Sequence, residues 1–225
     1  MVNYEKTLSL LTKDIKYFSK IKKKDIKLVI VTKAQKINAI NNLINLGYNT
    51  FGENYLQEAI EKIKIINKKN ISWHYIGKIQ SNKIKQIVQY FDWIQTISSL
   101  KHAKMINDIS NNINKIMNVC VQVNIDCETS KSGLDINELE EFIENIKNYE
   151  NIKIRGLMSI PSKSNALKGN ENSYKILGSM YDNLCKKHKS FDTLSLGMSN
   201  DYKLAMDSGS NLIRIGTLIF GKREL

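Results

Sequence analysis

The 225-residue sequence contains little proline, cysteine or arginine, and each scarcity limits the domain organisations and kinds of site that the chain can have. Pro161 is the only proline and no low-complexity linker divides the chain, so one domain over residues 1–225 is the simplest organisation. Cys120, Cys127 and Cys185 form no C-x-x-C pair, which disfavours a metal site and indicates a reducing compartment. No run approaches the roughly 20 apolar residues of a membrane span, and no signal peptide is recognisable. We therefore expect a cytoplasmic protein without a metal or a membrane partner.

Positive charge, by contrast, is abundant, with a formal net charge of +12 at pH 7. Arginine occurs only at Arg155, Arg214 and Arg223, so lysine supplies 31 of the 34 basic residues. The lysines are dispersed, and no helix-turn-helix, RRM, KH or zinc-finger signature accompanies them. We interpret the surplus as a solvated basic surface and expect no nucleic-acid partner. The lysine bias makes the few arginines worth following.

Short β-branched runs alternate along the chain with longer amphipathic segments. The first run, residues 27–32, is apolar almost throughout, as expected of a parallel strand buried on both faces. The predicted strands cover residues 27–32, 49–52, 71–76, 92–97, 116–125, 152–160, 193–196 and 211–215, with helices over 37–46, 82–90, 100–113, 136–149 and 202–208 and two more ending near 66 and 187. Eight alternations predict a (β/α)8 TIM-type barrel with an extra N-terminal helix over residues 4–18. A doubly wound open sheet is the alternative, because alternation alone does not show closure.

In such a barrel, functional groups gather where strands end. Lys33 directly follows the first strand. With so many lysines, a surface position is the ordinary interpretation, but at this end of an interior strand partial desolvation frees the amine as a nucleophile. The third strand carries His74 and Tyr75, one of which must face the barrel interior. Asn54, after the second strand, suits either a helix cap or a ligand contact.

The last two strands lead into loops rich in small and hydroxylic residues. Ser199 follows the seventh strand, and Gly216 and Thr217 follow the eighth, where barrels commonly bind phosphate. Arg214 lies within the eighth strand, which is an unusual place for an arginine unless it meets an ion pair or a polar ligand. A lysine nucleophile, a phosphate site and an arginine together suit a phosphorylated aldehyde with a ring acceptor. Pyridoxal 5′-phosphate (PLP) meets these conditions.

These residues lie in motifs that resemble the YggS/PROSC family of pyridoxal phosphate homeostasis proteins. The resemblance runs in order from about residue 27 to the C-terminus. The matching stretches are Val31-Thr32-Lys33, Phe51-Gly52-Glu53-Asn54-Tyr55, Trp73-His74-Tyr75-Ile76-Gly77, Gln80-Ser81-Asn82-Lys83, Gln122-Val123-Asn124-Ile125, Ser130-Lys131-Ser132-Gly133, Arg155-Gly156-Leu157-Met158, Gly197-Met198-Ser199 and Arg214-Ile215-Gly216-Thr217.

The resemblance implies a barrel similar to the N-terminal domain of alanine racemase, with PLP held on Lys33 as a Schiff base. It also implies that Arg214 faces the pyridine nitrogen, that the last two loops hold the phosphate, and that residues of the second, third and sixth strands line the pocket. The residues assigned in this way to the cofactor are Lys33, Asn54, His74, Met158, Ser199, Arg214, Gly216 and Thr217.

The function that the resemblance implies is PLP homeostasis and control of amino-acid and keto-acid balance, by a monomeric carrier without catalytic turnover. An amine or a PLP-accepting apoenzyme is its expected partner. A PLP-dependent amino-acid racemase is the alternative, although the sequence ends at Leu225, directly after the barrel, without the second domain of alanine racemase. A Schiff-base aldolase, which uses a barrel lysine without a cofactor, is a further possibility.

Overall fold

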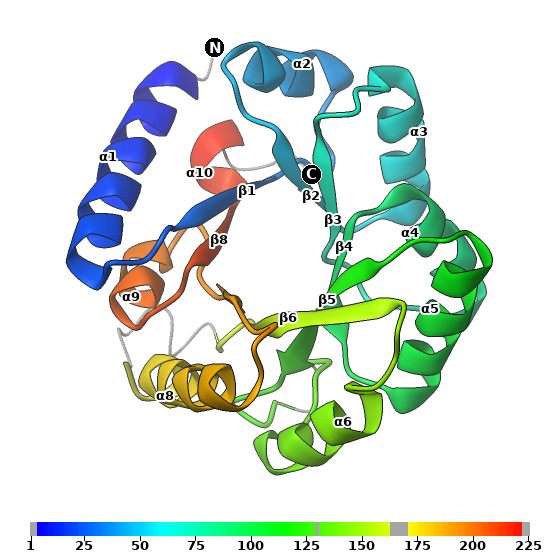
Figure 1. The fold of residues 1–225 in the computed structure, drawn as a ribbon. Coiled ribbons are helices and arrows are strands. Elements are labelled where there is room, and N and C mark those ends of the chain that lie inside the picture. Colours follow the sequence, from blue (N-terminus) through cyan, green and yellow to red (C-terminus); the bar gives the residue numbers. More distant parts are fainter. Residues whose placement is uncertain (1–3, 129–130, 163–170, 222–225) are drawn as a thin grey trace.

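Eight parallel strands close into a barrel. A computed structural model describes residues 4–128, 131–162 and 171–221. Each strand pairs with the next along the chain, and β1 (Lys27–Val31) also pairs with β8 (Leu212–Ile215), with Lys27 opposite Leu212 and Ile30 opposite Ile215. This last pairing confirms the predicted barrel and excludes the open sheet. In Figure 1 most of the helices surround the strands on the outside.

The elements alternate in the predicted order. The remaining strands are β2 (Thr50–Glu53), β3 (Ser72–Tyr75), β4 (Trp93–Ile97), β5 (Met117–Val123), β6 (Ile152–Ser159) and β7 (Thr193–Ser195). The helices are α1 (Tyr4–Lys22), α2 (Ile37–Asn45), α3 (Leu56–Ile66), α4 (Ile84–Tyr90), α5 (Leu100–Asn112), α6 (Leu139–Ile146), α8 (Glu171–Lys187), α9 (Tyr202–Asp207) and α10 (Thr217–Phe220), with 3-10 turns at Ser81–Lys83 and Ile136–Glu138.

The boundaries differ from expectation at a few places. Every strand begins and ends within two residues of its predicted limits. The N-terminal helix continues four residues beyond residue 18, and α10 is a short helix that no pattern predicted. The segment predicted as one helix over 136–149 begins with a 3-10 turn and ends at Ile146. None of the described helices combines the length and apolarity needed to cross a membrane.

Buried side chains form two separate layers, because successive residues of a strand point to opposite faces of the sheet. Between the sheet and the helices lies the main apolar core, to which Phe51 and Ile94 belong. Trp93, Cys120 and Met158 form a second cluster, separate from that core. These residues alternate with the outward-facing ones and therefore fill the barrel interior.

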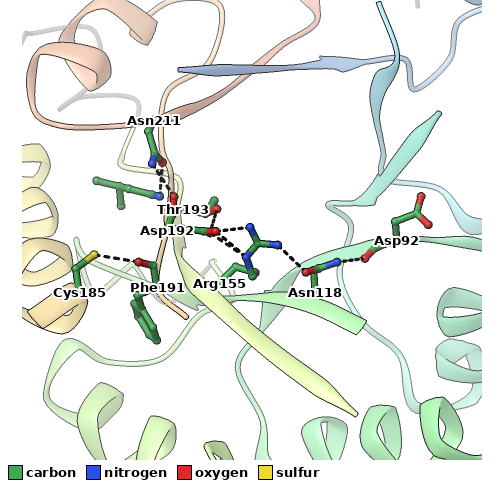
Figure 2. A network of polar contacts seen from close by, with 9 residues as sticks. Asp92, Asn118, Arg155, Cys185, Phe191, Asp192, Thr193 and Asn211 are labelled. Carbon is green, nitrogen blue, oxygen red and sulfur yellow. Dashed lines mark hydrogen bonds and ion pairs between the residues drawn. The ribbon is translucent and has the colours of Figure 1, made fainter. Parts of the chain in front are cut away.

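The amino-terminal end of the barrel is closed by Arg155 of β6 (Figure 2). Its guanidinium forms an ion pair with Asp192, donates to the Asn118 side chain at 2.8 Å and lies 4.7 Å from the ring centroid of Trp93. Asn118 in turn donates to the backbone carbonyl of Asp92. These polar contacts lie at the amino-terminal ends of the strands, whereas ligands of such barrels bind at the carboxyl-terminal ends.

Candidate functional site

Lys33 lies two residues beyond β1 at the carboxyl-terminal mouth of the barrel and is half-buried. The preceding Thr32 donates its backbone N–H to the Gly52 carbonyl at 3.0 Å, so the pairing continues past the assigned strand. The Thr32 hydroxyl donates to Glu53 on the helix side of the sheet, at 2.7 Å. Because Thr32 is directed to the helix side and side chains of an extended segment alternate in direction, we expect Lys33 to face the barrel axis.

Arg214, in β8, is buried in the barrel, where it is only 3% exposed. Its two terminal nitrogens donate to the Ser195 hydroxyl at 2.6 Å and to the Ser159 carbonyl at 3.0 Å. Burial lowers the pKa of Arg214 to about 10, an effect that the charge of Asp201 opposes, so the guanidinium remains cationic at neutral pH. Within the described parts of the chain no carboxylate pairs with it, and a buried cation bound only to neutral groups suits an electron-rich ligand.

A chain of hydrogen bonds joins Arg214 to His74 across the barrel interior. The Ser195 hydroxyl donates to Gln95 at 2.6 Å, and the Gln95 amide lies 2.8 Å from Nδ1 of His74. Because the amide nitrogen can only donate, Nδ1 is the acceptor. The other ring nitrogen then carries the proton, 3.3 Å from the Ser72 hydroxyl.

His74 is the interior member of the His74–Tyr75 pair, and it is neutral. Tyr75 packs on the outside of the sheet against Phe91, with ring centroids 5.2 Å apart. The His74 ring stacks on Trp93 at 4.9 Å and is almost fully buried. Burial, reinforced by the charge of Lys27, lowers the pKa of His74 to about 3. His74 therefore supports the site as a neutral hydrogen-bonding group.

The loops after β7 and β8 contact each other at the carboxyl-terminal end of the barrel. The Ser199 hydroxyl accepts the backbone N–H of Leu218 at 3.0 Å, which connects the two loops directly. Gly216 is half-buried and Thr217 is exposed. A Cβ on Gly216 would lie 3.1 Å from the Val31 carbonyl oxygen, so this loop packs against the end of the strand that leads to Lys33. Ser199 in the loop after β7, and Gly216 and Thr217 directly after β8, thus follow the two strands that precede β1 in the order around the barrel.

Buried Asp201 holds the shape of the loop after β7. One carboxylate oxygen accepts the backbone N–H of Met198 at 2.7 Å, and the other accepts the hydroxyl of Tyr174 at 2.6 Å. The loop is therefore tied both to itself and to α8, and its backbone is fixed before any ligand enters.

Asn54 and Met158 lie on the other side of the mouth, in the wall of a cavity of about 210 Å³. The Asn54 amide donates to the Ile76 carbonyl at 3.4 Å, and its side chain does not cap α3. Its buried carbonyl oxygen Oδ1 has no hydrogen-bond partner among the described residues, so it is available to a ligand donor. Met158 is fully buried and contributes an apolar wall.

Several residues that organise the mouth were not expected from the sequence. Gln95 and Ser195 connect His74 to Arg214, and the signal that could have found them is a polar residue within an otherwise apolar strand. Asp201 lies two residues beyond the Gly197-Met198-Ser199 stretch and was given no role from the sequence. No group of three or more His, Cys, Asp or Glu residues within the described ranges is arranged to hold a metal ion.

Comparison with known proteins places the chain among characterised families. A family model described as the alanine racemase N-terminal domain matches residues 7–224. The pyridoxal phosphate homeostasis protein of Pasteurella multocida is 39% identical over 88% of this chain and 87% of its own, and that of Haemophilus influenzae is 35% identical over 99% and 97%.

Solved structures agree with this assignment. PipY of Synechococcus elongatus, solved with PLP bound, is 27% identical, has a TM-score of 0.86 and matches over 97% of this chain and 100% of its own. Alanine racemase of Clostridium difficile has a TM-score of 0.75 at 18% identity, over 99% of this chain and 57% of the racemase, which is a likeness of fold alone.

The closed barrel, with its lysine after β1 and its linked loops after β7 and β8, defines a (β/α)8 barrel of the alanine racemase N-terminal class. Within that class, the chain belongs to the family of pyridoxal phosphate homeostasis proteins, as the full-length matches at 35–39% identity establish.

Proposed function

We propose that this protein binds PLP as a Schiff base on Lys33 and acts in PLP homeostasis and amino-acid and keto-acid balance. The observation that supports the proposal is that β7, β8 and β1 are neighbours in the barrel: the linked Ser199 loop follows β7, the cationic Arg214 lies in β8, and Lys33 follows β1. The relatives named as homeostasis proteins and the PLP-bound PipY support it. When bound, PLP supplies a reactive aldehyde and an electron-withdrawing ring.

The donor set suits this cofactor. Lys33 would hold the cofactor through its amine, since an aldehyde condenses with an amine to a C=N bond with loss of water. Arg214 would face the ring nitrogen and, because it stays cationic, would disfavour a proton there. Without that proton the ring is a poor electron sink, which suits a carrier better than an enzyme. Ser199, Gly216 and Thr217 would hold the phosphate.

The other candidate residues are Asn54 and Met158 in the cavity wall and His74 in the barrel interior. Asn54 offers its unpartnered carbonyl oxygen, and Met158 provides an apolar surface. His74 acts through Gln95 and Ser195, holding the hydroxyl that accepts from Arg214. We further propose a cytoplasmic monomer of one domain that yields its cofactor to amines or apoenzymes.

Substitution of the proposed nucleophile tests the assignment. We expect Lys33→Ala to lose the visible absorbance that PLP gives with the parent protein and the mass added by borohydride reduction. Lys36→Ala is the matched control, because Lys36 is an exposed lysine three residues away and should behave like the parent. Peptide mass spectrometry of the reduced protein locates the modified lysine. A reducible adduct that persists in Lys33→Ala would overturn the assignment.

The match to the alanine racemase family model favours amino-acid racemisation as the second candidate function. Chiral chromatography of alanine and serine incubated with the PLP-loaded protein distinguishes the two. A carrier leaves the enantiomers unchanged, whereas rapid racemisation that depends on Lys33 would establish the enzyme. A colourless protein that ignores PLP would instead favour a cofactor-independent aldolase.

A further inference from the structure

A buried ion-pair cluster surrounds the backbone of Lys33 on the helix side of the sheet. Lys62 of α3 donates to the Thr32 carbonyl at 2.7 Å, directly before Lys33. Glu58 of α3 accepts the backbone N–H of Ala34 at 2.6 Å, directly after it. Both peptide groups next to Lys33 are therefore bound by side chains of one helix.

The two anchors are themselves connected. Lys62 pairs with Glu58 at 2.5 Å and with Glu53 of β2 at 2.7 Å. Glu53 also accepts the Thr32 hydroxyl at 2.7 Å, which adds a second contact to the residue before Lys33. We call Glu53, Glu58 and Lys62 the Lys33 clamp.

Two of the three clamp residues are buried charged side chains, which packing of α3 on the sheet does not require. The side chains of Lys62 and Glu53 are 5% and 0% exposed. Apolar residues of similar volume usually stabilise a fold as well as a buried ion pair does, because charges lose their hydration. The backbone that the clamp holds is also unusual, since Ala34 has a φ of +61°, in the left-handed region that residues other than glycine seldom adopt. Residues kept in such a conformation require the surroundings to enforce it.

We propose that the Lys33 clamp is a positioning unit that fixes the direction from which the Lys33 amine approaches an aldehyde. This inference rests on the proposed function, because it assigns a purpose to the backbone geometry only if Lys33 is the attachment point. Glu53, Glu58 and Lys62 do not contact the ligand; they act through the Thr32 and Ala34 peptide groups. A clamp that merely fastened α3 to the sheet would affect unfolding but not the reaction of Lys33.

Glu58 offers the sharpest test, because its side chain is 30% exposed and its replacement leaves Lys62 paired with Glu53. We expect Glu58→Ala to slow Schiff-base formation with PLP and weaken PLP affinity by about tenfold, as for loss of a charge-assisted hydrogen bond. Glu58→Gln keeps an acceptor for the Ala34 N–H, so it should stay within about threefold of the parent. Lys62→Met, which releases the Thr32 carbonyl, should be impaired at least as much as Glu58→Ala.

Stopped-flow absorbance gives the rate, a titration gives the affinity, and thermal unfolding without PLP reports the fold. Lys104→Met is the control, because it breaks an exposed i,i+4 ion pair with Asp108 on α5 and should leave the rate and affinity unchanged. If Lys62→Met does not fold, the comparison of Glu58→Ala with Glu58→Gln is sufficient to test the clamp. The clamp is refuted if folded Glu58→Ala reacts like the parent, or if Glu58→Gln is as slow as Glu58→Ala. If the parent itself gives no reduced adduct on Lys33, the proposed function fails instead.

Discussion

At the scale of single residues, Arg214 and His74 show how one buried chain of hydrogen bonds holds two ionisable groups in opposite states. Arg214 keeps its charge, because the intrinsic pKa of a guanidinium is so high that burial lowers it only to about 10. His74 starts near neutrality and is shifted to a pKa of about 3, so it stays uncharged. Of these two buried residues, only Arg214 is charged at neutral pH.

The depressed pKa of His74 predicts a pH dependence of stability. In the unfolded chain a histidine takes up a proton near pH 6.5, whereas folded His74 does so only near pH 3, so the free energy of unfolding falls as the pH drops between these values. The slope from this one group approaches about 1.4 kcal/mol per pH unit. We expect His74→Gln to lose that contribution, as measured by urea unfolding at several pH values from 7 to about 4. Equal slopes for parent and variant would contradict the buried neutral state.

Position along the chain revealed some site residues and concealed others. Lys33 was recognisable because it directly follows an apolar run, and Arg214 because it lies inside one. The link between Lys62 and the Thr32 carbonyl could not be predicted, since it depends on how α3 packs on β1 and β2. Long-range contacts of this kind leave no local signal in the sequence.

At the scale of elements, β6 contains an irregularity that arranges both ends of the barrel. The pairing with β5 runs from Val119 opposite Ile154 to Cys120 opposite Gly156, so Arg155 is an extra residue in β6. Such a bulge changes the direction of neighbouring side chains. Here it allows Arg155 to reach Asp192 at the amino-terminal end (Figure 2). Met158, three residues further along β6, lines the cavity at the mouth.

Gly156 is required for this bulge. Its φ is +146°, and a Cβ there would lie 1.9 Å from the Thr193 carbonyl oxygen of β7. We expect Gly156→Ala to lower the free energy of unfolding by about 3 kcal/mol or more, measured by urea unfolding. Gly47→Ala is the control that separates backbone strain from steric collision. Gly47 has a φ of +91°, but no atom lies within 4 Å of an added Cβ. We expect this variant to lose only about 1 kcal/mol of the free energy of unfolding. Similar losses in the two variants would argue against the collision.

Element boundaries were predictable where periodicity is strong and less so where tertiary contacts decide. Helix α1 was expected to end at residue 18, but it continues to Lys22, which pairs with Asp207 of α9 at 2.8 Å. Helix α10 spans only four residues, which is too short for a helical repeat to be visible in the sequence. The first difference goes with a contact to a distant part of the chain, and the second with the shortness of the helix.

At the scale of the whole molecule, the sequence could suggest the barrel but could not close it. Eight alternations are compatible with an open sheet, and only the pairing of β1 with β8, across most of the chain length, decides. Helix α1 adds to this long-range assembly, because Asp14 accepts from the Tyr202 hydroxyl at 2.7 Å and Tyr4 packs edge-on against Phe220. The two ends of the described chain are thus held together on one side of the barrel (Figure 1).

The net charge of +12 leads to a prediction for the molecule as a whole. Like charges spread over a small folded protein repel one another more than in the expanded unfolded chain, so the compact state is penalised at low salt. Raising the ionic strength from about 0.01 to about 0.15 M shortens the screening length from about 30 to about 8 Å. We therefore expect the unfolding temperature to rise with potassium chloride, as followed by calorimetry on the PLP-free protein. Charge reversal at the exposed Lys16 and Lys69 lowers the net charge by two at each position and should shrink the rise. A fall with salt would mean that the attractive ion pairs, such as Lys187 with Glu140, outweigh the general repulsion.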